Sequence, residues 1–165
     1  MEIRSITDDQ FEEMAKRHPT LFEKSKTDSF QIGQGWLLIV DTLCYLLSSR
    51  LEGAKNHLRY VKELNNAPKT KNLYDTQISE IETAIEQYQK DIPTIIHVKE
   101  KFGGLVFKCV VETEEARNYI DFAQTLSMRT CECCGAPGEP RNEGWTKVLC
   151  EKHHRDRNND DQNEN

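Results

Sequence analysis

The sequence predicts an α+β protein in which an antiparallel helical hairpin packs with a β-hairpin and a helix, followed by a C-terminal zinc ribbon. Three observations support this class: two stretches with apolar residues at helical spacing, two strand-like segments that flank a glycine pair, and paired cysteine half-sites near the C-terminus. We therefore expect a helical region, a β-hairpin with a helix, the ribbon and a disordered tail over 1–92, 93–128, 129–155 and 156–165, respectively.

Composition and charge limit the function. The 165 residues are 30% charged and 36% apolar, and the net charge is −6, so the chain lacks the strongly basic profile of a sequence-independent nucleic-acid binder. No segment approaches the roughly 18 apolar residues of a membrane span, and the N-terminus has no apolar signal core. We therefore expect a cytoplasmic protein without a membrane partner, in which the six cysteines are reduced or metal-bound.

The first predicted element is a short helix. The residues from Thr7 to Gln10 match a capping box, and the helix should end at His18 because proline follows it. The next residues, as far as Gly35, predict a connector with a few buried anchors, namely Leu21, Phe22, Phe30 and Ile32.

Two amphipathic helices follow the connector. The first spans about 36–64 and carries one continuous apolar stripe, formed by Trp36, Val40, Leu43, Leu47, Leu51, Ala54, Leu58, Val61 and Leu64. The second spans about 73–89 and has the same period, with Leu73, Ile78, Ile81, Ile85 and Tyr88. Helices joined by a short polar loop form an antiparallel hairpin, and both stripes indicate core packing.

The next segment predicts a β-hairpin that turns at Gly103-Gly104. With that turn, Lys99 would face Lys108 across the strands, an unfavourable like-charge pair, and Glu100 would lie on an otherwise apolar face. One interpretation is that the lysines point into solvent and Glu100 pairs with a nearby base. The other is a basic face that binds an acidic protein surface, a phosphate or a nucleotide; its candidate residues are Lys99, Lys101, Lys108 and Glu100, with His97 beside them.

Thr113 is the predicted N-cap of the last helix, because acidic residues in the following turn favour the helix dipole. The core face of this helix should consist of Ala116, Tyr119, Ile120, Ala123 and Leu126.

The cysteine-rich segment predicts a metal site. Cys131-x2-Cys134 and Cys150-x2-His153 form two half-sites separated by 15 residues, a spacing typical of tetrahedral structural zinc. Two alternatives stay open, since Cys133 can replace a neighbouring cysteine and His154 can replace His153. Four protein ligands leave no open coordination position, so the predicted cofactor is one structural Zn²⁺ rather than a catalytic ion.

The sequence lacks the patterns of common active sites. A related zinc-stapled arrangement occurs in HNH nucleases, but the segment between the half-sites has no histidine to act as general base. No Gly-rich phosphate loop, G-x-S-x-G elbow or H-E-x-x-H is present. Cys44 and Cys109 lie in apolar contexts typical of inert thiols, and His18 and His57 are isolated. We therefore expect no enzymatic activity.

Two motifs together resemble a known group of proteins. VKEKFGGLVF and TCECCGAPG…GWTKVLCEKH are similar to the V-K-E-K-F-G-x-L-x-F hairpin and C-E-x-C-G…G-W…L-C-x-x-H ribbon of small phage and proteobacterial proteins without an assigned activity. The resemblance covers about 95–153 well, and the helical half only at Gly33-Gln34-Gly35-Trp36, which matches a G-x-G-W helix start. It implies a phage-linked context and places the ligands at Cys131, Cys134, Cys150 and His153, with Cys133 as an extra cysteine.

The expected function is therefore binding. We expect a phage-linked protein that engages and inhibits a host protein, such as a defence component, by occlusion. The basic hairpin face and the exposed side of the helical hairpin are the candidate surfaces. One alternative is a nucleic-acid-binding regulator that uses the basic residues of the ribbon, Arg129, Arg141, Lys147, Lys152, Arg155 and Arg157. Another is capture of a small anionic ligand by the β-hairpin.

Overall fold

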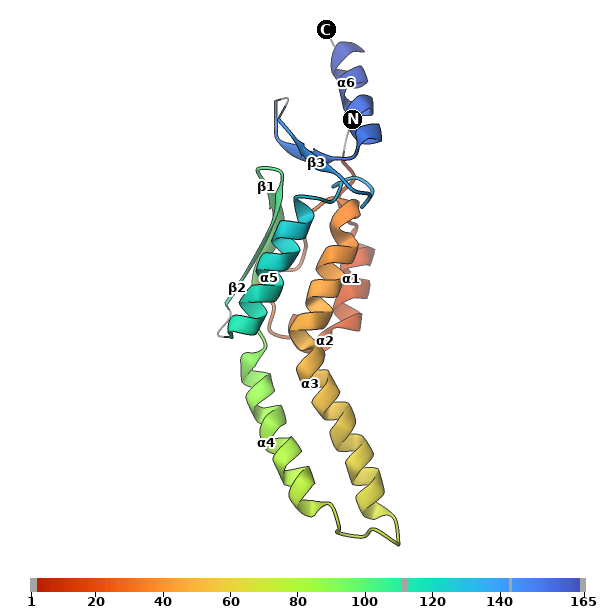
Figure 1. Cartoon of the computed structure of the whole chain (residues 1–165), viewed down its shortest axis with the longest axis vertical. Coiled ribbons are helices and arrows are strands. Elements are labelled where there is room, and N and C mark those ends of the chain that lie inside the picture. Colours follow the sequence, from red (N-terminus) through yellow and green to blue (C-terminus); the bar gives the residue numbers. More distant parts are fainter. Residues whose placement is uncertain (1–2, 111–112, 143, 164–165) are drawn as a thin grey trace.

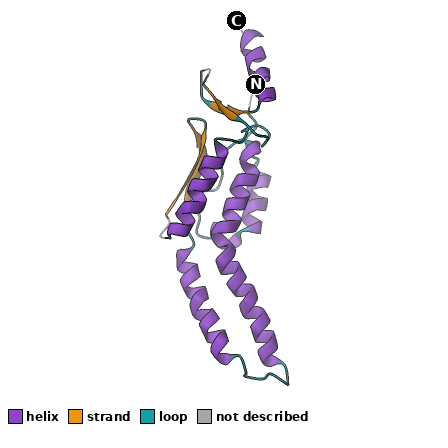
Figure 2. Cartoon of the chain, viewed as in Figure 1, coloured by secondary structure: helices purple, strands orange, loops and turns teal. Residues whose placement is uncertain are grey.

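The computed structural model describes residues 3–110, 113–142 and 144–163. These residues form an α+β fold with six α-helices and two antiparallel β-hairpins. The molecule is elongated: two long helices project at one end, and the cysteine-rich segment, which we define as residues 129–155, lies at the other (Figure 1). In the middle of the molecule, the first β-hairpin runs alongside the helix that follows it in the sequence, and the second β-hairpin lies closer to the C-terminal helix (Figure 2). Within the described residues, no helix combines the length and the apolarity needed to cross a membrane.

Helix α1 (Asp8–Arg17) begins with the predicted capping box. Thr7 Oγ1 accepts a hydrogen bond from the Gln10 amide (3.2 Å), and the Gln10 side chain accepts one from the Thr7 amide (2.9 Å). The helix ends at His18 as predicted, but Pro19 then starts a second short helix, α2 (Pro19–Phe22), in place of the expected loop. Proline favours the first position of a helix, so the same residue ends one helix and starts the next.

The predicted helical hairpin is confirmed. A 3-10 turn, η1 (Gln34–Trp36), leads into α3 (Leu37–Asn66), and α4 (Asp75–Asp91) packs antiparallel to it. Helix α4 starts two residues later than the predicted start at about residue 73, and Leu73, a predicted member of the apolar stripe, is 69% exposed. Asn65 explains the later start: its side chain accepts from the Tyr74 amide (2.9 Å) and donates to Asp75 (2.7 Å), which ties the loop to the end of α3.

Strands β1 (Thr94–Lys101) and β2 (Gly104–Val110) pair antiparallel, but not in the predicted register. The turn is Phe102-Gly103, with φ of +52° and +78°, and not Gly103-Gly104. The Gly103 amide donates a hydrogen bond to Glu100 Oε1 (2.7 Å), so the Glu100 carboxylate holds the turn in this position.

The corrected register changes the cross-strand pairs. Lys99 faces Val106, and Lys108 faces His97, so the predicted Lys99–Lys108 pair is wrong. The register differs from the prediction by two residues, and a shift of two keeps every side chain near the turn on its predicted face. Glu100 therefore does lie on the core face, beside the buried Val98.

Helix α5 (Glu114–Ser127) starts at Thr113 as predicted, since Thr113 Oγ1 accepts from the Ala116 amide (3.3 Å). It closes the free edge of β2: Ser127 Oγ accepts from the Leu105 amide (3.0 Å), and Gln124 Oε1 accepts from the Phe107 amide (3.2 Å). The core face is confirmed except at its end, where Leu126 is 40% exposed.

The core lies where α1, α2, the start of α3, the β-hairpin and α5 meet. Its fully buried members include Met14, Leu21, Trp36, Leu51 and Ile95. The predicted anchors of the connector belong to it, because Leu21, Phe30 and Ile32 are buried and Phe22 packs against them. This core reaches the cysteine-rich segment through Val148.

The C-terminal part contains β3 (Glu139–Arg141), β4 (Lys147–Leu149) and α6 (Glu151–Asn163). Where the sequence predicts a disordered tail over 156–165, the structure continues α6 as far as Asn163; residues 164 and 165 lie outside the described residues. The helix begins within the second half-site, where the His154 amide donates to the Cys150 carbonyl oxygen (2.9 Å).

Candidate metal centre

Two tight turns present the predicted metal ligands. Cys131 and Cys134 lie in the turn after α5, which closes through the Gly135 amide and the Cys131 carbonyl oxygen (2.9 Å). Gly135 has φ of +75°, a conformation that glycine adopts without strain. Cys150 follows directly after β4, and His153 lies in the first turn of α6. The fold therefore brings together two half-sites that are far apart in sequence.

The four side chains converge. Their ligand atoms lie within 4.8 Å of one another. His153 Nδ1 is 3.4 Å from Cys131 Sγ and 3.3 Å from Cys150 Sγ, and the sulfurs of Cys134 and Cys150 are 3.9 Å apart. Metal–sulfur bonds of about 2.3 Å would place two sulfurs of a tetrahedral site about 3.8 Å apart. The spacing is therefore that of a site able to hold one metal ion.

Cys133 and His154 lie outside this cluster. Cys133 is half-buried, and its interaction with Cys131 raises the pKa of the Cys133 thiol. His154 Nε2 lies 3.3 Å from the Asn158 side chain, four residues further along α6. The two alternative ligands that the sequence left open are therefore not members of the cluster.

Hydrogen bonds favour the thiolate form of Cys131. The Cys133 side chain makes the largest contribution, and the backbone groups of Cys150, Cys133 and Cys134 add to it. Together they outweigh burial and lower the pKa of Cys131 to about 3. Burial acts in the opposite direction at Cys134 and raises the pKa of that thiol. A thiolate is the form of cysteine that binds metals.

The first half-site packs directly on the segment before α3. The Gly35 amide donates to the Glu132 carbonyl oxygen (2.9 Å), and Trp36 Nε1 donates to the Thr130 carbonyl oxygen (2.8 Å). A Cβ atom at Gly35 would clash with the Cys131 carbonyl oxygen, and one at Gly33 would clash with that of Glu132. The Gly33–Trp36 motif therefore packs against the cysteine-rich segment and holds it in position, a role that the sequence did not reveal.

A buried ion triad links the two β-hairpins. Lys147 Nζ on β4 lies 2.9 Å from Glu100 Oε2 on β1 and 3.3 Å from Glu132 Oε2 in the cysteine turn. The three side chains are only 21%, 14% and 3% exposed, respectively. Burial raises the pKa of Glu132, and the nearby charge of Glu100 raises it further, while Lys147 acts against both. One interpretation of the sequence was that Glu100 pairs with a base, but Lys147 was not identified as that base because the two residues are far apart in the sequence.

The basic face, which we define as His97, Lys99, Lys101 and Lys108, lies on the side of the β-hairpin opposite Glu100. Glu100 is therefore not one of its binding residues, contrary to the sequence-based grouping. Within residues 3–110, 113–142 and 144–163, no ion pair involves any of the three lysines. Burial lowers the pKa of His97, and the positive charges of Lys99 and Lys108 lower it further.

The basic residues of the cysteine-rich segment are in a different situation. Arg141 pairs with Glu139 (2.9 Å) and Glu151 (3.1 Å), and Arg155 lies 3.8 Å from Glu151. Lys147 belongs to the buried triad. At least three of the six residues proposed to meet nucleic acid are therefore already engaged within the chain.

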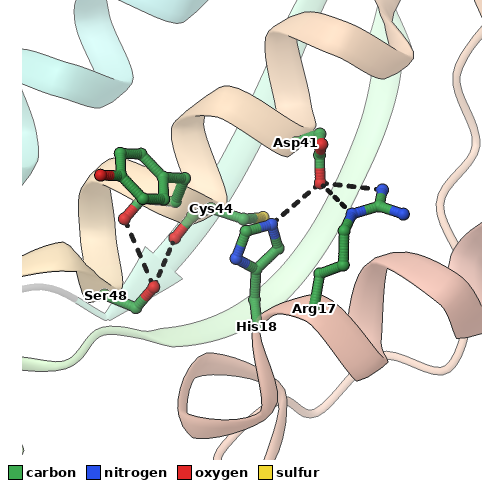
Figure 3. A network of polar contacts seen from close by, with 6 residues as sticks. Arg17, His18, Asp41, Cys44 and Ser48 are labelled. Carbon is green, nitrogen blue, oxygen red and sulfur yellow. Dashed lines mark hydrogen bonds and ion pairs between the residues drawn. The ribbon is translucent and has the colours of Figure 1, made fainter. Parts of the chain in front are cut away.

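A polar network between α1 and α3 has residue types that occur in catalytic sites, but its histidine and the neighbouring cysteine, His18 and Cys44, are buried. His18 Nε2 lies 2.8 Å from Asp41 Oδ1, and Arg17 donates to the same oxygen from Nε (3.2 Å) and Nη2 (3.0 Å) (Figure 3). Cys44, one helical turn further along α3, is fully buried, and burial raises the pKa of its thiol. A buried protonated thiol is a poor nucleophile. The hydrogen bonds from Arg17 and His18 to Asp41 instead connect the end of α1 to α3.

An apolar groove runs between α3 and α5. It has a volume of about 190 Å³, and its exposed walls include Leu38, Phe122 and Leu126. Among the described residues, those that line it carry no carboxylate, amine, imidazole or thiol, and Thr42 and Tyr119 contribute hydroxyl groups.

No family model, curated protein or solved structure matches this chain. A functional proposal therefore depends on the geometry of the cysteine cluster and of the surfaces around it.

Proposed function

We propose that this chain is a non-enzymatic binding protein whose cysteine-rich segment is held by one structural Zn²⁺. The observation that carries the proposal is the convergence of Cys131, Cys134, Cys150 and His153, with all ligand atoms within 4.8 Å. Three thiolates and one imidazole at tetrahedral spacing suit zinc better than hard cations such as Mg²⁺ or Ca²⁺, which prefer oxygen ligands. Four protein ligands complete the coordination, so the ion would stabilise the fold and not activate water.

The proposed partner is a protein. The phage-linked context implied by the resemblance points to a host protein, such as a defence component, which the chain would inhibit by covering part of its surface. Two features support binding over catalysis. The described lining of the apolar groove is mainly aliphatic and aromatic, and the cysteine–histidine combination at Cys44 and His18 is buried. The ion pairs of Arg141, Lys147 and Arg155 make the cysteine-rich segment a less suitable surface for nucleic acid.

Metal analysis tests the zinc assignment. The purified protein should contain one zinc per chain, Cys134→Ser should lose it, and Cys133→Ser should keep it, because only Cys134 belongs to the cluster. Equal zinc in both variants, or none in the wild type, would overturn the assignment.

The binding role needs a separate test. The wild-type protein should enrich a specific protein from bacterial lysate and should not turn over nucleotides or nucleic acids. Measurable turnover that disappears in an active-site variant, or no enrichment over a tag-only control, would contradict the proposed function.

A further inference from the structure

The outward face of the β1–β2 hairpin carries lysines that form no ion pair within the described residues, 3–110, 113–142 and 144–163. We propose that the basic face is a docking surface for an extended acidic segment of a partner protein, in which carboxylates alternate with apolar side chains. This inference rests on the proposed function, because it assigns a surface to the binding role.

The register aligns the basic side chains. His97, Lys99 and Lys101 alternate along β1 and therefore share one face, about 7 Å apart from one to the next. Lys108 joins them from β2, directly opposite His97. None of the three lysines has an ion pair within the part of the chain that the structure describes. An incoming carboxylate would therefore not have to displace an internal carboxylate, and its attraction to the lysines would offset the cost of its desolvation.

Apolar side chains lie among these charges. Val106 sits opposite Lys99, and Val110 at the end of β2 is 58% exposed. Phe102 at the turn is 70% exposed and has φ of +52°, an unusual conformation for a bulky side chain, and Lys101 Nζ lies 5.1 Å from its ring centroid. This mixture fits an occupant that offers both carboxylates and apolar groups.

The hairpin is fixed from behind. Glu100, on the opposite face, is held by Lys147, and a Cβ atom at Gly103 would lie 2.8 Å from Thr146 Cγ2, so the turn packs closely on the cysteine-rich segment. A surface held in this way loses little conformational freedom on binding.

Charge number favours a protein segment over nucleic acid. Affinity for nucleic acid grows with the number of phosphates that a protein neutralises, and the basic face offers only three lysines on a chain with a net charge of −6. The net negative charge repels a long polyanion, while a short acidic segment meets only the local positive field.

Fluorescence anisotropy with a labelled peptide of alternating glutamate and leucine tests this surface. The wild-type protein should bind the peptide more weakly at higher salt, and should not bind the matched peptide with glutamine in place of glutamate. Lys99→Glu with Lys108→Glu should weaken binding more than about tenfold, and glutamine at the same positions should weaken it less. Lys69→Glu with Lys71→Glu, in the exposed loop between α3 and α4, makes the same change in net charge and should leave binding unchanged.

Each other outcome overturns the inference. No peptide binding, or equal losses in both double variants, would show that the basic face is not a docking surface. Tighter binding of a single-stranded oligonucleotide than of the acidic peptide would assign the face to nucleic acid. A protein captured from lysate equally by the wild type and by the Lys99→Glu, Lys108→Glu variant would preserve the proposed function and refute only this surface.

Discussion

Gly35 lies against the turn that carries Cys131 and Cys134, whereas Gly53 lies on an open side of α3 with no atom near the position of a Cβ. The same substitution should therefore have opposite effects. Gly35→Ala should lower the free energy of unfolding by about 2 kcal/mol or more, because the added methyl group meets the Cys131 carbonyl oxygen and the rigid turn cannot move away. Gly53→Ala should raise it by about 1 kcal/mol, since alanine favours the helix. Urea unfolding of both variants measures the difference; similar effects would contradict the close packing at Gly35.

Asp41 makes stability depend on pH. Burial raises the pKa of its carboxyl, but the hydrogen bonds from His18 and Arg17 outweigh burial, so that the pKa lies below its usual range. A carboxyl with a lower pKa in the folded state contributes stability above its unfolded pKa of about 3.9, and this contribution is lost as the pH falls through the folded value. Asp41→Asn should therefore be less stable than the wild type at pH 5, and the gap should shrink towards pH 3. A gap that stays constant over this range would exclude the ionised carboxylate as its cause.

At the scale of single residues, the sequence predicted the half-sites but not what holds them. The x2 spacings identified Cys131, Cys134, Cys150 and His153 because a local turn is enough to pair each set. The packing of Gly33 and Gly35 against the cysteine turn was not predicted, because the packing of two backbones across the fold leaves no local pattern in the sequence. Only a motif match drew attention to these glycines, without giving them a role.

Among the secondary-structure elements, the two β-hairpins depend on each other through Lys147. Lys147→Met would leave Glu100 and Glu132 together, buried and without a cation, and breaking such a group costs about 3 kcal/mol of stability. The triple variant that also carries Glu100→Gln and Glu132→Gln should recover much of this loss because it removes the uncompensated charges. Urea unfolding gives both values.

Lys62→Met is the matched control for this measurement. Lys62 pairs with Glu82 between α3 and α4, but both side chains are about half exposed (48% and 49%), so the change should stay below about 1 kcal/mol. A loss at Lys147 no larger than that at Lys62 would mean that the triad contributes no more than a surface pair.

Prediction of the elements succeeded where a pattern extends over many residues. The stripes of α3 and α4 extend over several turns, so their pairing followed from periodicity, whereas the start of α4 depends on the side chain of Asn65. The turn of the β1–β2 hairpin was predicted wrongly for a related reason. Gly103-Gly104 is the stronger local signal, but Glu100 and Thr146 fix the turn one residue earlier, and Thr146 is distant in the sequence.

In the molecule as a whole, the candidate metal centre lies at one end and the loop that joins α3 to α4 lies at the other (Figure 1). The cysteine-rich segment has two three-residue strands and few buried apolar residues of its own, Val148 and Leu149 among them, so its fold should depend on the proposed metal ion. The far part of α3 and α4 is held by its own apolar contacts, such as those of Val61 and Ile81. The cysteine-rich segment and the far part of α3 and α4 should therefore differ in how much local stability they lose when the ion is removed.

Hydrogen exchange with and without a zinc chelator measures this distribution. Chelation should increase exchange throughout the cysteine-rich segment and at the Gly35 amide, which loses its acceptor when the Cys131–Cys134 turn unfolds. Exchange in the far half of α3 and in α4 should stay unchanged, because neither contacts the metal centre. The serine variant of Cys134 should reproduce the chelated pattern without chelator, and the Cys133 variant should not. Uniform loss of protection along the chain would mean instead that the ion stabilises a single cooperative unit, in which the helical hairpin cannot stay folded without the centre at the other end.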